Sequence, residues 1–129
     1  MAKVEIVKRL LHEIEKKFKG EAHKVVDLME TLADNPFKGK PIGRVAGILI
    51  KEIKYKNFRF YFILEGEKLK VFSGEDLEHL LIRFVRMSDK KDQQKVINEI
   101  KNVLLKIGSG GFEIQFADAN CSLSILLIG

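Results

Sequence analysis

Basic side chains dominate the middle of this sequence, and they are the residues whose chemistry suits binding of phosphate or another anion. Residues 38 to 59 carry one acid, Glu52, against Lys38, Lys40, Arg44, Lys51, Lys54, Lys56 and Arg59. Residues 83 to 91 carry Asp89 against Arg83, Arg86, Lys90 and Lys91, whereas no Lys or Arg follows Gly108. A positive surface built from residues 38 to 91 predicts a nucleic acid or an acidic protein as partner. The alternative is the Lys/Glu-rich surface of a thermophilic protein.

Other site chemistries have little support in the sequence. His12, His23 and His79 are far apart and have no Cys or acid at ligand spacing, so we expect neither a metal site nor a cofactor. The chain has no Ser-His-Asp grouping and no glycine-rich phosphate loop. Cys121 is the only cysteine, which excludes an internal disulfide and favours a buried small residue in a reducing compartment.

The length and composition predict one folded domain. The chain has 129 residues, of which 46% are hydrophobic and 32% charged, and its net charge is +5. Its N-terminus alternates charged and apolar residues and lacks the apolar core of a signal peptide. No stretch approaches the roughly 20 apolar residues of a membrane span. We therefore expect a cytoplasmic protein without a membrane partner.

The elements that position the basic residues follow from changes in periodicity. Residues 3 to 7 alternate like a short strand, and two helices follow, one ending at Phe18 before Gly20 and one over residues 21 to 33. Pro36 ends this helical hairpin, and the density of Pro and Gly predicts a loop over residues 35 to 47. Strands are predicted over residues 48–55, 58–64, 68–72 and 81–87, with a short helical turn before Leu80.

The end of the chain is predicted as a long helix capped by Ser88, followed by Gly108-Ser109-Gly110-Gly111 and a tail with two β-like runs. The fold class is α+β, with the helices at one side of a small antiparallel sheet: the helical hairpin packs on the sheet, and a closing C-terminal helix and a β-like tail follow. We divide the chain into a domain over residues 1–107 and a Gly-rich linker with an apolar tail over residues 108–129.

Strand parity sorts the basic residues by face. Phe58, Phe60 and Phe62 point one way, and Arg59 and Tyr61 point the other. Lys54 shares parity with Glu52 and is expected opposite the Arg59 strand. Lys51 has the other parity, and Arg83 is expected on the face opposite Arg86.

Several of these features together resemble the RelE/ParE toxin superfamily. They are the short strand, the helical hairpin ending in Asn35-Pro36, the Gly/Pro loop, and the run from Ile50 through Phe58-Arg59-Phe60-Tyr61-Phe62. The run from Phe84 to Gln94 resembles the strand-to-helix junction of the HigB and phage-derived Gp49-like branch. The resemblance covers about residues 3 to 107. It implies a type II toxin: a ribosome-dependent messenger-RNA endoribonuclease, or mRNA interferase, whose partners are a cognate antitoxin and mRNA on the ribosome.

Two other functions remain open under the same resemblance. The ParE branch implies inhibition of DNA gyrase, and an inactive member would only bind its antitoxin. The tail is not covered by the resemblance. Ser122 to Ile128 could add a strand to a sheet edge, pair two chains as a homodimer, or mimic a bound antitoxin segment.

The resemblance also suggests roles for individual residues. Metal-independent cleavage by the 2′-OH needs a base, cations at the phosphate and an acid. Arg59 matches the strand arginine of the family and is expected to bind the phosphate, with Lys54 as base or second phosphate contact and Arg86 as a third catalytic residue. The residues expected to bind RNA are Lys40, Arg44, Lys51, Lys90 and Lys91.

The sequence also departs from the family pattern. Glu52 stands where such toxins have a second strand lysine, and Ile97 stands where they can carry a catalytic tyrosine. Neither Tyr55 nor Tyr61 matches that tyrosine, so the base and acid stay unassigned. The simplest alternative for the basic residues is a solvated surface with ordinary ion pairs.

Overall fold

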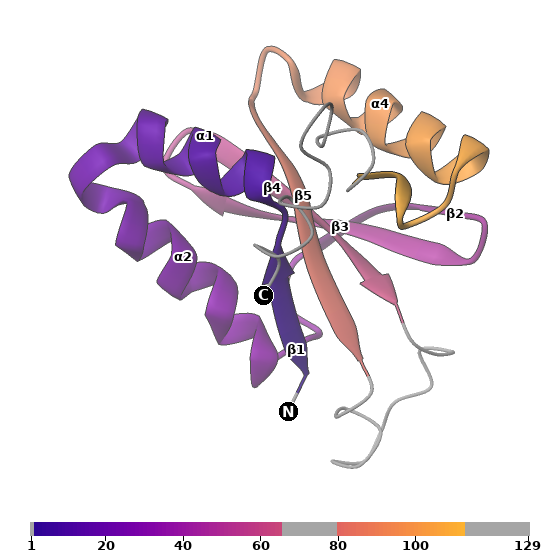
Figure 1. The fold of residues 1–129 in the computed structure, drawn as a ribbon, viewed down its shortest axis with the longest axis horizontal. Coiled ribbons are helices and arrows are strands. Elements are labelled where there is room, and N and C mark those ends of the chain that lie inside the picture. Colours follow the sequence, from indigo (N-terminus) through magenta and orange to yellow (C-terminus); the bar gives the residue numbers. More distant parts are fainter. Residues whose placement is uncertain (1, 66–79, 113–129) are drawn as a thin grey trace.

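The computed structural model describes residues 2–65 and 80–112 (Figure 1). The α+β class is confirmed. The elements are β1 (Lys3–Ile6), α1 (Lys8–Phe18), α2 (Ala22–Glu30), β2 (Lys40–Val45), β3 (Ile48–Tyr55), β4 (Phe58–Glu65), β5 (Leu81–Asp89) and α4 (Gln93–Lys106), with 3₁₀ turns at Lys19–Glu21 and Thr31–Ala33. The predicted strand at 68–72, the turn before Leu80 and both tail strands lie outside the described residues. Within these ranges no helix is long and apolar enough to cross a membrane.

The five described strands form one sheet in the order β1-β5-β4-β3-β2. The sheet is mixed rather than antiparallel throughout, because β1 pairs with β5 in parallel. The prediction of a loop over residues 35 to 47 was wrong at β2, which pairs with β3 through a two-residue turn. Ala46 and Gly47 have φ of 52° and 80° in that turn, as tight hairpins require. Pro41 is tolerated because β2 is an edge strand with a bulge.

The helical hairpin covers one face of the sheet, which we call the helical face. Phe18 of α1 packs edge-on against Phe58, with ring centroids 5.4 Å apart, and lies 6.0 Å from Phe60. The predicted apolar stripes of the hairpin are buried here, including Leu10 and Ile14. Burying such side chains contributes roughly 1.5–3 kcal/mol each.

The opposite face carries Arg59 and Tyr61 and is covered by α4, so we call it the α4 face. Contacts from α4 to Glu52 and Arg86 place the helix there, and Figure 1 shows α4 and the hairpin on different sides of the sheet. The prediction that helices lie on one side was therefore wrong for α4. Its apolar stripe, which includes Ile97 and Ile100, is buried against this face.

A bulge in β5 corrects the predicted facing of two arginines. Tyr61 pairs with Arg86 but Phe62 pairs with Phe84, so Val85 is an extra residue in the ladder. The extra residue brings Arg83 and Arg86 onto the same α4 face, although their spacing predicted opposite faces.

The start of α4 also differs from the prediction. Ser88 does not cap the helix, because β5 continues to Asp89 opposite Phe58. The helix begins at Gln93, and the Asp89 carboxylate accepts a hydrogen bond of 2.9 Å from the Asp92 backbone N–H.

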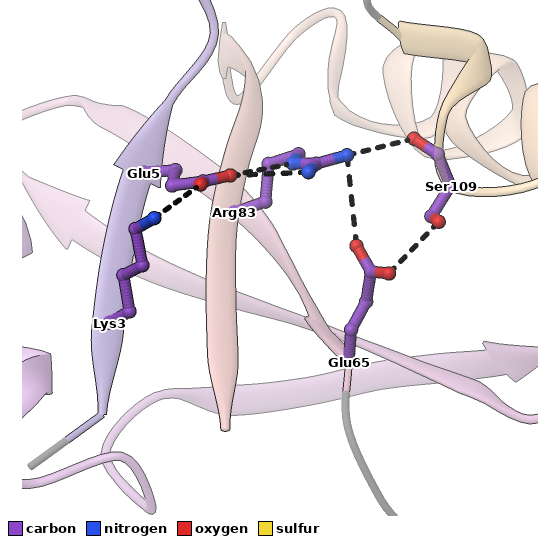
Figure 2. A network of polar contacts seen from close by, with 5 residues as sticks. All are labelled: Lys3, Glu5, Glu65, Arg83 and Ser109. Atoms are coloured by element: carbon purple, nitrogen blue, oxygen red, sulfur yellow. Dashed lines mark hydrogen bonds and ion pairs between the residues drawn. The ribbon is translucent and has the colours of Figure 1, made fainter. Parts of the chain in front are cut away.

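The segment that follows α4, up to residue 112, packs onto the sheet. Gly108, with φ of 100°, ends the helix, and its N–H bonds to the Val103 carbonyl. Phe112 is fully buried. Arg83 joins this turn to the sheet: it pairs with Glu5 and Glu65 and donates to the Ser109 carbonyl at 3.3 Å (Figure 2). Residues 108 to 111, expected to be a flexible linker, are thus held against the sheet and the end of α4.

Candidate functional site

The strand register brings several predicted site residues together on the α4 face. Lys54 lies on the strand opposite the Arg59 strand, as predicted, and the register places it directly across from Arg59, which in turn lies opposite Ser88. In the next row, Lys40 pairs with Glu52, and Glu52 with Tyr61. The basic residues of three neighbouring strands therefore share one surface.

Arg59 has the most unusual environment of these residues. Its side chain is 11% exposed, and its Nε is buried without a hydrogen-bond partner. The Oε2 atom of Glu52 lies 3.9 Å from this nitrogen, which is an ion pair but is too long for a hydrogen bond. A buried unsatisfied donor costs roughly 1–3 kcal/mol, and the charge of the nearby Glu52 carboxylate offsets part of that cost. An oxyanion is the ligand that an arginine donor fits best.

Glu52 is held in place by the first residue of α4. Its side chain is only 3% exposed, and its Oε1 accepts a hydrogen bond of 3.3 Å from Gln93 Nε2. This contact fixes the start of α4 beside Arg59. Sequence reasoning noted Glu52 only as a departure and missed Gln93, because their contact joins positions that only the folded sheet brings together.

The turn from β5 into α4 adds two exposed cations next to Arg59. It follows Ser88 and Asp89, which pair with Arg59 and Phe58, and it contains Lys90 and Lys91. Lys54 is also exposed. We call Lys54, Arg59, Lys90 and Lys91 the basic corner. It combines exposed ammonium groups at the surface with one guanidinium that is mostly buried.

A buried hydroxyl pair lies behind the basic corner. The Tyr61 hydroxyl and Ser88 Oγ are 2.8 Å apart, and either can be the donor. Burial raises the pKa of Tyr61, and the Ser88 bond opposes that rise. The phenol is fully buried and stays neutral near pH 7. Its place is structural, which agrees with its mismatch to the family tyrosine.

Arg86 is placed in the interior rather than at the surface. It is 4% exposed, its Nε pairs with Glu99 of α4, and its Nη1 donates to the Val85 carbonyl at 3.0 Å. Its guanidinium also lies 5.4 Å from the centroid of the Phe112 ring. Burial lowers the pKa of Arg86, while Glu99 acts to raise it. The predicted catalytic contact with RNA is therefore not favoured, and Arg86 instead joins α4 and the last turn to the sheet.

Two residues expected to bind RNA lie on the other face. Lys51 pairs with Phe62 and Arg44 with Leu49, so both belong to the helical face. The sheet separates them from the basic corner, in agreement with the parity that distinguished Lys51 from Lys54. Lys40 is exposed and stays on the α4 face.

The basic corner has the chemistry of an anion site, because its ammonium and guanidinium groups supply positive charge and hydrogen-bond donors. In residues 2–65 and 80–112, no group of three or more His, Cys, Asp or Glu could hold a metal ion. No protein-family model matches the chain, and comparison with curated proteins and with solved structures finds no significant match.

Proposed function

We propose that this protein is a RelE/HigB-type toxin of a type II toxin–antitoxin pair, acting in the cytoplasm as a ribosome-dependent mRNA endoribonuclease. The observation that carries the proposal is the pairing of Arg59, whose side chain is 11% exposed, with the exposed Lys54 directly opposite on the neighbouring strand. A fixed guanidinium donor in a positively charged corner suits a phosphate whose charge increases during reaction.

The proposed reaction is an internal phosphoryl transfer. The 2′-OH of the RNA attacks the adjacent phosphorus, the bond from phosphorus to the 5′-oxygen breaks, and the products are a 2′,3′-cyclic phosphate and a 5′-OH. A base takes the 2′-OH proton, and an acid gives a proton to the leaving oxygen. Arg59 binds a non-bridging phosphate oxygen and stabilises the added charge of the transition state. DNA lacks the attacking hydroxyl, so selectivity for RNA follows.

We assign supporting roles to the three lysines of the basic corner. Lys54 contacts the phosphate or exchanges the proton of the attacking hydroxyl. Lys90 and Lys91 hold the flanking backbone, where each neutralised phosphate adds salt-dependent affinity. A cognate antitoxin would block this surface.

One observation favours a second candidate, an inactive member of the superfamily that only binds its antitoxin. Glu52 puts a carboxylate 3.9 Å from Arg59, where a lysine would have increased the positive charge. Such a protein would keep the fold but stabilise the transition state poorly.

The test is controlled induction in a growing bacterial host, followed by mapping of the 5′ ends of cellular messages. We expect growth arrest and new cuts in translated messages, both lost in Arg59→Ala and reduced in Lys54→Ala. Lys16→Ala, at an exposed lysine of α1, is the matched control and should behave as the unchanged protein. Arrest without cuts, together with inhibited DNA supercoiling, would move the assignment to gyrase. Folded protein without arrest would support the inactive member.

A further inference from the structure

A small pocket lies on the helical face, on the side of the sheet away from the basic corner. Its volume is about 230 Å³, and its walls include Pro36, Phe37, Leu49, Leu64 and Leu80. Leu64 and Leu80 are almost fully buried, whereas Phe37 is 63% exposed. The pocket therefore has an apolar floor and a large exposed aromatic residue in its wall.

Two basic residues complete the lining of this apolar pocket. Lys51 is 6% exposed, and its Nζ donates one hydrogen bond, of 2.8 Å, to the Phe37 carbonyl. Arg44 of β2 also lines the pocket and is exposed. Burial lowers the pKa of Lys51.

The charge of Lys51 is poorly compensated by the part of the chain that the structure describes. An ammonium group has three N–H donors, and one carbonyl accepts from only one of them. Among the described residues, no carboxylate forms an ion pair with Lys51. Buried charges in proteins are normally paired, because leaving water is costly for an ion. A nearly buried lysine with a single carbonyl partner in the wall of a pocket is an arrangement that suits an anion.

We propose that this pocket binds a small monocarboxylate with an apolar body. The carboxylate would pair with Lys51 and Arg44, and the hydrocarbon would pack against the leucines and Phe37. The volume lies below the roughly 300 Å³ at which pockets for drug-sized ligands begin, so the ligand is small. A polyanion such as phosphate fits less well, because most of the lining is apolar and only two side chains carry positive charge.

This site is independent of the proposed nuclease function. Lys51 and Lys54 point to opposite faces of β3, so occupation of the pocket places nothing against Arg59. The carboxylate site can be disproved without affecting the RNA proposal, and the reverse also holds.

The test is isothermal titration calorimetry on the full chain with phenylacetate and with hexanoate. Phenylacetamide, which has the same ring but no charge, is the matched ligand control. We expect at least one of the two carboxylates to bind in the millimolar range or tighter and the amide to show no binding. Lys51→Met keeps the aliphatic stem and should weaken binding at least tenfold, and Arg44→Ala should weaken it less because that residue is exposed. Lys16→Met, on α1, should bind as the unchanged protein does.

A second readout follows the Lys51 amine itself. A bound carboxylate favours the charged ammonium, so an NMR titration should show the pKa of Lys51 rising when ligand is added. This measurement uses the unchanged protein and does not depend on a variant folding. The proposal is overturned if neither carboxylate binds, if the amide binds equally well, or if Lys51 does not respond to bound ligand. Lys51 would then be only an anchor for the segment containing Phe37.

Discussion

Replacing Glu52 with Gln should make the protein less stable and at the same time improve its binding of RNA. The substitution keeps the shape of the side chain and can keep a hydrogen bond to Gln93, but it removes the charge next to Arg59. The nearly buried guanidinium then loses its counterion in the free protein. A phosphate that approaches Arg59 no longer meets a carboxylate beside it.

The size of both effects follows from the 3.9 Å separation between Glu52 Oε2 and Arg59 Nε. At an effective dielectric constant of about 20, two unit charges at this distance attract by about 4 kcal/mol. Desolvation offsets part of that attraction, so we expect Glu52→Gln to lower the free energy of unfolding by about 2 kcal/mol. Removal of the repulsion should tighten RNA binding about tenfold, which corresponds to about 1.4 kcal/mol.

Two assays separate these effects. Urea unfolding followed by circular dichroism gives the stability, and fluorescence anisotropy with a 2′-O-methyl oligoribonucleotide gives the affinity for an RNA that cannot be cleaved. Glu30→Gln, at an exposed position of α2, is the charge-matched control. The reasoning fails if Glu52→Gln binds RNA no better than this control, or if its stability is unchanged.

Further substitutions test the structural parts of the account by urea unfolding. Arg86→Ala should lower the unfolding free energy by about 3 kcal/mol, because it removes a buried charge with several partners, and a loss below 1 kcal/mol would contradict that role. Gly111→Ala puts a Cβ 2.8 Å from side-chain atoms of Val103 in α4 and of Ile107 just after it, and should cost about 1–3 kcal/mol, whereas Gly110→Ala, with nothing within 4 Å, should be neutral. Tyr61→Phe leaves Ser88 without its side-chain partner and should cost about 1 kcal/mol near pH 7. Burial raises the pKa of Tyr61 above its ordinary value of about 10, so the native state still binds the phenol proton at pH values where the unfolded state has lost it. The contribution of Tyr61 to the free energy of unfolding should therefore fall as the pH rises above 10. This pH dependence should be absent in Tyr61→Phe.

The predictable part of this fold is the part set by local periodicity. The i, i+4 spacing of Leu10 and Ile14 marks the buried stripe of α1, and the alternation from Phe58 to Phe62 fixes which side of β4 carries Arg59. The same parity correctly separated Lys54 from Lys51. Each of these inferences needs only neighbouring positions in the chain.

The errors arose where tertiary contacts override local preference. Ser88 has the chemistry of a helix cap, but pairing with β4 and the Tyr61 hydroxyl holds it in the sheet. Pro41 and the surrounding glycines suggest a loop, yet an edge strand with a bulge accepts them. The extra residue at Val85, which has no side-chain signature, reverses the expected facing of the arginines in β5.

The candidate site could be predicted as a set of residue types but not as an arrangement. The sequence indicates Arg59 and Lys54 through parity and motif. The depth of Arg59 and the burial of Arg86 depend on α4, whose Gln93 and Glu99 reach back to the sheet. Only the folded chain shows which arginine retains an unsatisfied donor.

The most direct test of the central claim is the chemistry of the cut made by the purified protein on a defined message bound to ribosomes. We expect upstream fragments that end in a 2′,3′-cyclic phosphate and downstream fragments with a 5′-OH. Arg59→Ala should slow the cut by about 10²–10³-fold while the variant stays folded. Fragments with a 3′-OH end, or an Arg59→Ala variant that cuts at the unchanged rate, would contradict the proposed mechanism.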